Sequence, residues 1–76
     1  MNNSRRQQLK KWIQEVEIIK HKLEAICEEE EMAFDSMPEG LQGTLNGMNS
    51  EEAIEKMNDA ISCVEDAVNY IEEIII

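Results

Sequence analysis

Four carboxylates at helical spacing are the first side chains in this sequence that could do chemistry. They are Glu24, Glu28, Glu31 and Asp35. Spacings of three and four residues place side chains on one face of a helix, so the set could bind a divalent cation. Sites for such hard cations usually also take loop oxygens in a defined order, and no EF-hand loop occurs here. We therefore predict no metal site, and the carboxylates serve either solubility or the docking of a basic partner.

The residue types that serve as nucleophiles or general bases are few and isolated. His21 is the single histidine and stands between two lysines, on the expected outer face of a helix. Cys27 and Cys63 have neither a CxxC partner nor an evident base, and we expect reduced thiols in small, half-buried sites. A phosphate-cradling glycine loop, a zinc spacing and a Glu-x-x-His pair are also missing from the sequence. The sequence thus predicts a protein that is not an enzyme and takes no cofactor.

The elements that position these residues come from a short, acidic chain. Its 76 residues correspond to one domain with a modest core. The formal net charge of -10 disfavours direct binding of nucleic acid. The basic start, MNNSRRQQLKK, has no apolar stretch behind it, and no apolar run approaches membrane-spanning length. We therefore expect neither a secretory signal nor membrane association, and a cytoplasmic location.

The first of two amphipathic segments extends over about residues 4–36 and has apolar residues at alternating steps of three and four, which is typical of a helix. Its predicted seam is Leu9, Trp12, Val16, Ile19, Leu23, Ile26, Ala33 and Met37, widened by Ile13, Cys27 and Phe34. Asn3 or Ser4 is the expected N-cap. The loop that follows, over about residues 37–49, holds the three glycines and the single proline, the composition of a sharp turn.

The second segment, over about residues 50–75, repeats one seven-residue pattern, which is typical of a helix that supercoils around a partner. Its predicted seam is Ile54, Met57, Ile61, Val64, Val68, Ile71 and Ile75. A capping box is expected to start this helix at Asn49. Two long helices joined in this way lie antiparallel, so the residue numbers of two positions that face each other add up to about 86. The sequence predicts an all-α fold, an antiparallel two-helix coiled-coil hairpin, with Leu41, Leu45 and Met48 covering the open end of its seam.

The second helix has more apolar surface than one partner helix can cover. Beside its seam runs a column of mostly small residues at seven-residue spacing, flanked by a thiol and an aromatic ring. This predicted oligomer interface consists of Ala53, Ala60, Cys63, Ala67, Tyr70 and Ile74. Alanine columns let helix axes approach closely, and an uncovered apolar face favours association. We expect this face to form a homodimeric four-helix bundle or a larger homo-oligomer, or to dock on another protein; the alternative is a single hairpin with some apolar residues on its surface.

The hairpin concentrates the net charge at one end. The half nearest the loop, residues 23–63, holds eleven carboxylates and a single base, Lys56, whereas the remaining residues hold six of each sign. Like charges this close destabilise the fold by repulsion, and carboxylates near the end of the first helix oppose its dipole. Both roles, solubility and docking on a basic partner, are compatible with this acidic loop end.

The stretch AFDSMPEGLQG, followed by a glycine-containing loop and EEAIEKMNDAISCVEDAVNYIEEI, resembles a family of small acidic helical-hairpin proteins from Firmicutes and their phages and mobile elements. In that family the centre reads Phe-Asp-x-x-Pro-Glu-x-Leu-Gln-Gly-Ser. Thr44 stands here in place of the serine. The matching residues are Phe34, Asp35, Pro38, Glu39, Leu41, Gln42 and Gly43. The resemblance implies a bacterial or phage origin and an accessory role, such as interference with a host system.

Two functions of different classes follow as expectations. In the first, the protein is a binding module, such as a phage or mobile-element inhibitor, that docks its acidic loop end on a basic surface of a bacterial defence or DNA-processing protein. An apolar centre with a charged rim suits such a contact. The predicted partner-binding residues are Glu28, Glu31, Phe34, Asp35, Glu39, Leu41, Leu45 and Glu51. In the second, the hairpin is an assembly unit whose charge serves solubility only. A narrower form of the first function is a DNA mimic, in which the carboxylates take the place of the phosphates of DNA.

Overall fold

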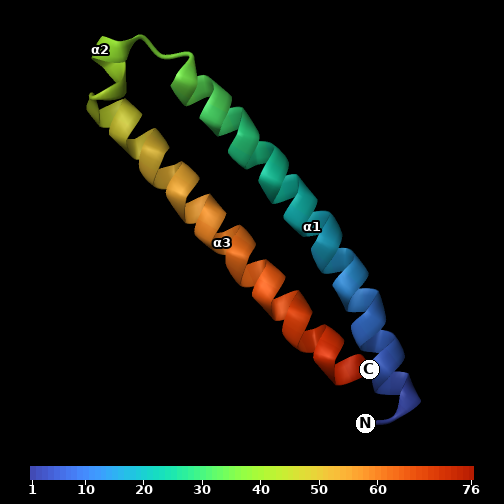
Figure 1. Ribbon diagram of the computed structural model, residues 1–76. Helices are drawn as coiled ribbons and strands as arrows, with labels where there is room; N and C mark the ends of the chain where they lie inside the picture. Colours follow the sequence, from blue (N-terminus) through green and yellow to red (C-terminus); the bar gives the residue numbers. More distant parts are fainter.

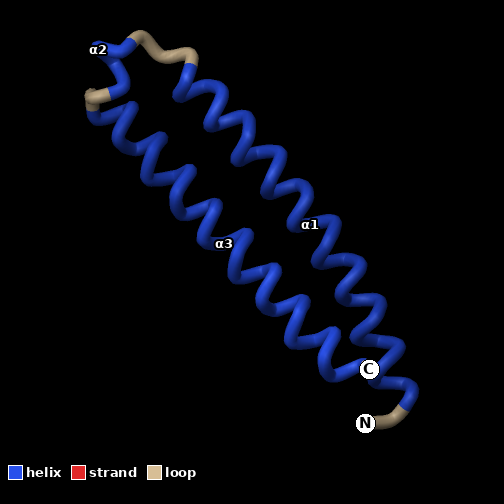
Figure 2. Tube along the Cα trace, in the orientation of Figure 1, coloured by secondary structure: helices blue, strands red, loops and turns tan.

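The computed structural model describes all of residues 1–76 as a helical hairpin (Figure 1). α1 spans Asn3–Asp35, a short α2 spans Glu39–Gln42, and α3 spans Leu45–Ile75. The two long helices lie side by side and antiparallel, so both chain termini are at the end opposite the bend (Figures 1 and 2). The predicted all-α hairpin is confirmed. None of its helices combines the length and the apolar content that crossing a bilayer requires.

The hairpin is a thin rod with a narrow core. Its extents are 58 × 15 × 14 Å, and its Cα radius of gyration is 17.3 Å, compared with about 11 Å for a compact domain of this length. Cys27, Gly47, Ser50 and Val68 are the buried residues, and no large side chain is completely removed from solvent. The core is therefore one seam between two helices.

The seam of α3 is the predicted one, and the seam of α1 is not. Each predicted seam residue of α3 is buried or half-buried. On α1 the seam residues are Arg6, Leu9, Ile13, Val16, Lys20, Leu23, Cys27, Glu30 and Phe34. The prediction was wrong for Trp12, Ile19 and Ile26, which are 50%, 59% and 55% exposed, and Ala33 is exposed as well. α1 is rotated so that a column with polar members faces α3 and a more apolar column faces outward.

Polar contacts across the seam define its register. Lys20 Nζ lies 3.5 Å from Glu65 Oε1, and the Cys27 thiol lies 3.6 Å from Asn58 Oδ1. The residue numbers in each pair sum to about 85, in agreement with the antiparallel register expected from the hairpin. Lys20 and Cys27 thus find partners on α3, which offsets part of the cost of placing them between the helices, whereas Arg6 Nε is buried without a hydrogen-bond partner.

Backbone contacts and one amide side chain close the bend. Gln42 Nε2 donates hydrogen bonds to the carbonyl oxygens of Phe34 and Met37, at 3.2 and 3.3 Å, and the backbone of Gly47 packs directly on the backbone of Gln42. The expected apolar cover was wrong. More than half of each side chain that was expected to provide it is exposed: Leu41, Leu45 and Met48.

Both long helices begin earlier than the sequence indicated, α3 by more than one turn. The N-cap of α1 is Asn2, whose side-chain oxygen accepts a 2.9 Å hydrogen bond from the Arg5 N–H. α3 begins at Leu45 after Thr44, so the expected capping box at Asn49 lies inside the helix. The helix can start there because Gly47 has no side chain to clash with Gln42.

Candidate functional site

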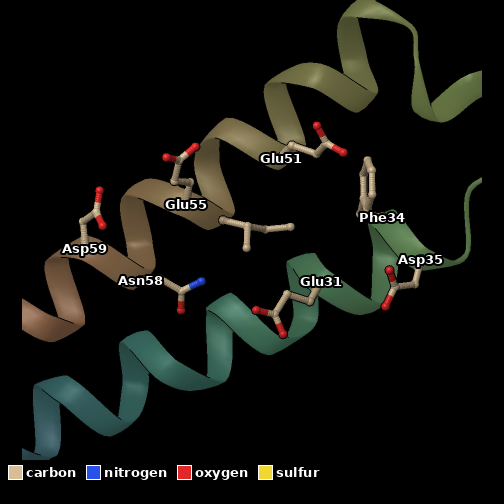
Figure 3. A pocket seen from close by; sticks show the side chains of 8 residues that line it. Glu31, Phe34, Asp35, Glu51, Glu55, Asn58 and Asp59 are labelled. Atoms are coloured by element: carbon tan, nitrogen blue, oxygen red, sulfur yellow. The ribbon is translucent and has the colours of Figure 1, made fainter.

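A groove lined by carboxylates lies between α1 and α3 in the loop half of the hairpin. Its volume is about 500 Å³, and its lining residues are Glu31, Phe34, Asp35, Glu51, Ile54, Glu55, Asn58 and Asp59. We call it the acidic groove. Figure 3 shows the ring of Phe34 projecting from α1 toward Glu51 of α3, with Glu31 and Asp35 on the same stretch of α1. Five carboxylates therefore surround two apolar side chains.

The heptad positions of the two helices bring these residues to one side of the seam. In an antiparallel pair, equivalent flanking positions of the two helices face each other. The contacts of Lys20 with Glu65 and of Cys27 with Asn58 identify which flanks meet. The seven-residue columns on this side are Glu17, Glu24 and Glu31 of α1 and Glu51, Asn58, Glu65 and Glu72 of α3. We call this side the polar flank, and the acidic groove is the part of it nearest the bend.

None of the five groove carboxylates takes part in an ion pair. Lys20 contacts three carboxylates of the polar flank further from the bend. Lys56, the single base of the loop half, pairs with Glu52 at 3.0 Å, and this hydrogen bond and charge raise the pKa of Lys56. Glu52 and Lys56 do not line the groove. The negative charge of the groove is therefore not neutralised by the chain itself.

The acidic groove contains half of the predicted partner-binding residues: Glu31, Phe34, Asp35 and Glu51. Glu28 lines a smaller adjoining hollow together with Cys27. Glu39 and Leu41 lie in α2 and Leu45 in the first turn of α3, outside both hollows. Of the three apolar residues in the predicted set, Phe34 lines the groove, and Leu41 and Leu45 do not.

Sequence reasoning missed four residues that line the acidic groove: Ile54, Glu55, Asn58 and Asp59. The predicted antiparallel pairing of the two helices could have identified them. Because the residue numbers of two facing positions add up to about 86, Glu31 faces a residue near 55 of the second helix and Phe34 faces a residue near 52. Ile54 was expected in the seam, where one edge of its side chain also reaches the groove.

Cys27 is 3% exposed and lies beneath the adjoining hollow. Its thiol is 3.7 Å from Glu31 Oε1 and 3.6 Å from Asn58 Oδ1. Burial and the negative charge of Glu31 raise the pKa of the Cys27 thiol, so the reactive thiolate is scarce at neutral pH. Cys63 is exposed. The two thiols thus differ in burial, and neither is half-buried as expected.

We expect one fast-reacting thiol in the folded protein. Cys63 should react with a disulfide reagent such as DTNB at the rate of an exposed thiol, whereas Cys27 should react only after denaturation, because it is buried and protonated. Intact mass should show one label before denaturation and two after it. The variant Cys63→Ser should take up none in the folded state; labelling of both thiols at similar rates would contradict this assignment.

The remaining candidates for chemistry are dispersed. The His21 side chain is 70% exposed, with Nδ1 3.5 Å from Glu24 Oε2. The carboxylates that shared a helix face in the sequence are divided, since Glu24 also pairs with Lys20 while Asp35 lines the acidic groove. The structure contains no group of three or more His, Cys, Asp or Glu side chains that could hold a metal ion.

Fold and site together define an all-α helical hairpin with an unneutralised acidic groove beside its bend. Comparison of the chain with protein-family models, with curated proteins and with solved structures gave no match. Its function is therefore inferred from the chemistry of its own surfaces.

Proposed function

We propose that this protein is a non-enzymatic binding module whose acidic groove docks on a basic surface of another protein. One observation carries the proposal: five carboxylates without ion-pair partners surround an apolar floor formed by Phe34 and Ile54. Solubility requires charge but no groove, and it gives no reason to arrange the carboxylates around apolar side chains.

Arginine and lysine side chains fit both parts of such a groove. Their aliphatic stems cover apolar surface while the cationic heads stay polar, and the heads form charge-assisted hydrogen bonds with carboxylates. A guanidinium can also stack on an aromatic ring such as that of Phe34. From Glu51 to Asp59 the groove follows α3 for about 12 Å, enough for two basic side chains one helical turn apart.

The finer form of the proposal names the kind of partner. The likeness of AFDSMPEGLQG to the loop of acidic hairpin proteins from Firmicutes and their phages supports an inhibitor that covers a basic surface of a bacterial defence or DNA-processing protein. Such a partner would be met in the bacterial cytoplasm. Unneutralised carboxylates would also attract it over a distance and speed association at low salt.

The test uses a groove variant, in which four lining carboxylates lose their charge: Glu31→Gln, Asp35→Asn, Glu51→Gln and Glu55→Gln. Tagged wild-type protein should capture proteins with basic surfaces from a Firmicutes lysate at low salt and release them at high salt. The groove variant should bind the captured partner at least about tenfold more weakly, a loss of about 1.4 kcal/mol.

A terminal variant is the matched control, because it removes the same number of charges away from the groove: Glu15→Gln, Asp66→Asn, Glu72→Gln and Glu73→Gln. It should bind the captured partner as wild type does. If both variants bind equally well, the charge serves solubility and the hairpin is an assembly unit, the alternative function. If both bind equally poorly, net charge rather than the groove carries the interaction.

A further inference from the structure

The side of the hairpin opposite the polar flank is apolar on both helices. We call it the apolar flank. On α1 it consists of Trp12, Ile19, Ile26 and Ala33, and on α3 of Ala53, Ala60, Ala67 and Ile74. All eight residues are exposed. α3 thus has three apolar columns, two in the seam and one beside it, which is typical of a helix that packs in a bundle rather than in a pair.

The antiparallel register places the two columns of the apolar flank next to each other. They occupy equivalent heptad positions on the side of the seam away from the contacts of Lys20 with Glu65 and of Cys27 with Asn58. Because the residue numbers of facing positions add up to about 86, each residue of one column lies level with one residue of the other, which gives four rows. The rows are Trp12 with Ile74, Ile19 with Ala67, Ile26 with Ala60, and Ala33 with Ala53.

We infer that a second copy of this chain covers the apolar flank and forms a four-helix bundle in which the two loops lie at opposite ends. The inference goes beyond the proposed binding function and does not depend on it, because the two sites are on opposite sides of the hairpin. The flank follows a rod 58 Å long and 15 Å wide, which offers about 800 Å², the area that each partner contributes to a standard interface.

The shape of the apolar flank favours loops at opposite ends. The flank is bulky near the chain termini, where the row of Trp12 and Ile74 lies, and shallow near the loop, where the row of Ala33 and Ala53 lies. With the loops at opposite ends, α1 packs on α1 of the second copy and bulky rows meet shallow ones. With the loops at the same end, the row of Trp12 and Ile74 packs on the same row of the second copy. These bulky side chains then hold the two rows of Ala33 and Ala53 apart.

This pairing also follows from the residue numbers. Residues 22–23 of α1 and 63–64 of α3 face each other in the register, so one two-fold axis can lie level with both. This axis brings Trp12 opposite Ala33 and Ile19 opposite Ile26 of the second copy. On α3 it brings Ala53 opposite Ile74. At the two ends of the flank, one axis therefore matches a large residue with a small one on both helices.

Charge favours the same arrangement. The loop half of each chain contains eleven carboxylates and one lysine, whereas the other half is neutral and contains six bases. Loops at the same end would bring two strongly negative halves together, at a cost in repulsion. Loops at opposite ends set each negative half beside a half with basic residues, and the two acidic grooves remain open on the outer sides of the bundle.

Two neighbouring isoleucines test the interface. Ile19 lies in the apolar flank and is 59% exposed, whereas Ile18 lies on the outer face of α1 and is 56% exposed. At micromolar concentration, sedimentation equilibrium should give twice the chain mass of 8.8 kDa for wild type and for Ile18→Glu. Ile19→Glu should give one chain mass while circular dichroism remains helical. A monomeric wild type, or dimers of both variants, would overturn the inference.

Crosslinking tests the arrangement without disturbing the flank. Cys63 lies beside the alanine column and level with the proposed two-fold axis. A short bis-maleimide should therefore join Cys63 of one wild-type chain to Cys63 of the other. In the double variant Cys63→Ser with Gly43→Cys, the new thiols lie at the loops and should not be joined. Efficient crosslinking through position 43 and none through position 63 would mean that the loops lie together.

Discussion

Replacing Gly47 by alanine is expected to lower the free energy of unfolding by about 3 kcal/mol, a large effect for the addition of one methyl group. Gly47 is buried where α3 passes the end of α2. A Cβ atom there would press against the carbonyl oxygen of Gln42 and lie 2.6 Å from its carbonyl carbon. Both are backbone atoms, so relief requires the bend itself to open, and that would also weaken the hydrogen bonds from Gln42 Nε2 to the end of α1.

The other two glycines provide the control for this substitution. An alanine at Gly40 or at Gly43 would have no atom within 4 Å of its Cβ, and no glycine of the chain has a positive φ. Gly40→Ala and Gly43→Ala should therefore leave stability unchanged or raise it by about 0.4–1 kcal/mol, because alanine restricts the unfolded chain. Urea unfolding followed by circular dichroism gives all three values. Similar losses at Gly40 and Gly47 would refute the steric origin of the effect.

The groove variant is expected to be more stable than wild type even though it has lost its binding surface. In the wild type, Glu31 and Asp35 are four residues apart on α1, and Glu51 and Glu55 are four apart on α3. Like charges at this spacing cost about 0.2–0.5 kcal/mol per pair, and repulsion across the groove adds to this. A total gain of about 1 kcal/mol corresponds to a rise in Tm of about 4–8 °C for a domain of this size.

Salt identifies the origin of that gain. Added salt screens repulsion between exposed charges, so it should raise the Tm of the wild type and have little effect on the groove variant. The terminal variant should show no gain in stability, because its four carboxylates come from the half of the chain that contains six bases. A groove variant less stable than wild type would mean that the carboxylates make stabilising contacts within the hairpin.

The fold was predictable because α3 has a single choice of seam. Its outermost column is acidic, with Glu52, Asp59, Asp66 and Glu73, so the two columns of bulky apolar residues on the opposite side face α1. α1 offers two adjacent pairs of apolar columns, and periodicity favours the more apolar pair, which includes Trp12 and Ile19. The structure uses the pair that contains Lys20 and Glu30, because each finds a partner on α3: Lys20 lies 3.5 Å from Glu65, and Glu30 accepts a 2.6 Å hydrogen bond from Ser50 Oγ.

The candidate site was predictable in its charge and only partly in its shape. Carboxylates on two helices had to gather near the bend once the hairpin was assumed, and Glu31, Asp35 and Glu51 do so. The apolar floor depended on the conformation of the bend, about which periodicity carries no information. There, α2 carries Leu41 out into solvent, and Ile54 completes the floor beside Phe34.

The rod shape affects how this protein moves through a column and through solution. A particle of 58 × 15 × 14 Å has a larger hydrodynamic radius than a sphere of the same 8.8 kDa. It should elute early from a gel-filtration column calibrated with globular standards, at the position of a heavier protein. Because the proposed second copy adds thickness rather than length, dimerisation should shift the elution volume less than a doubling of mass suggests. Sedimentation equilibrium and light scattering report mass independently of shape, and they should separate the two states where elution volume alone would merge them.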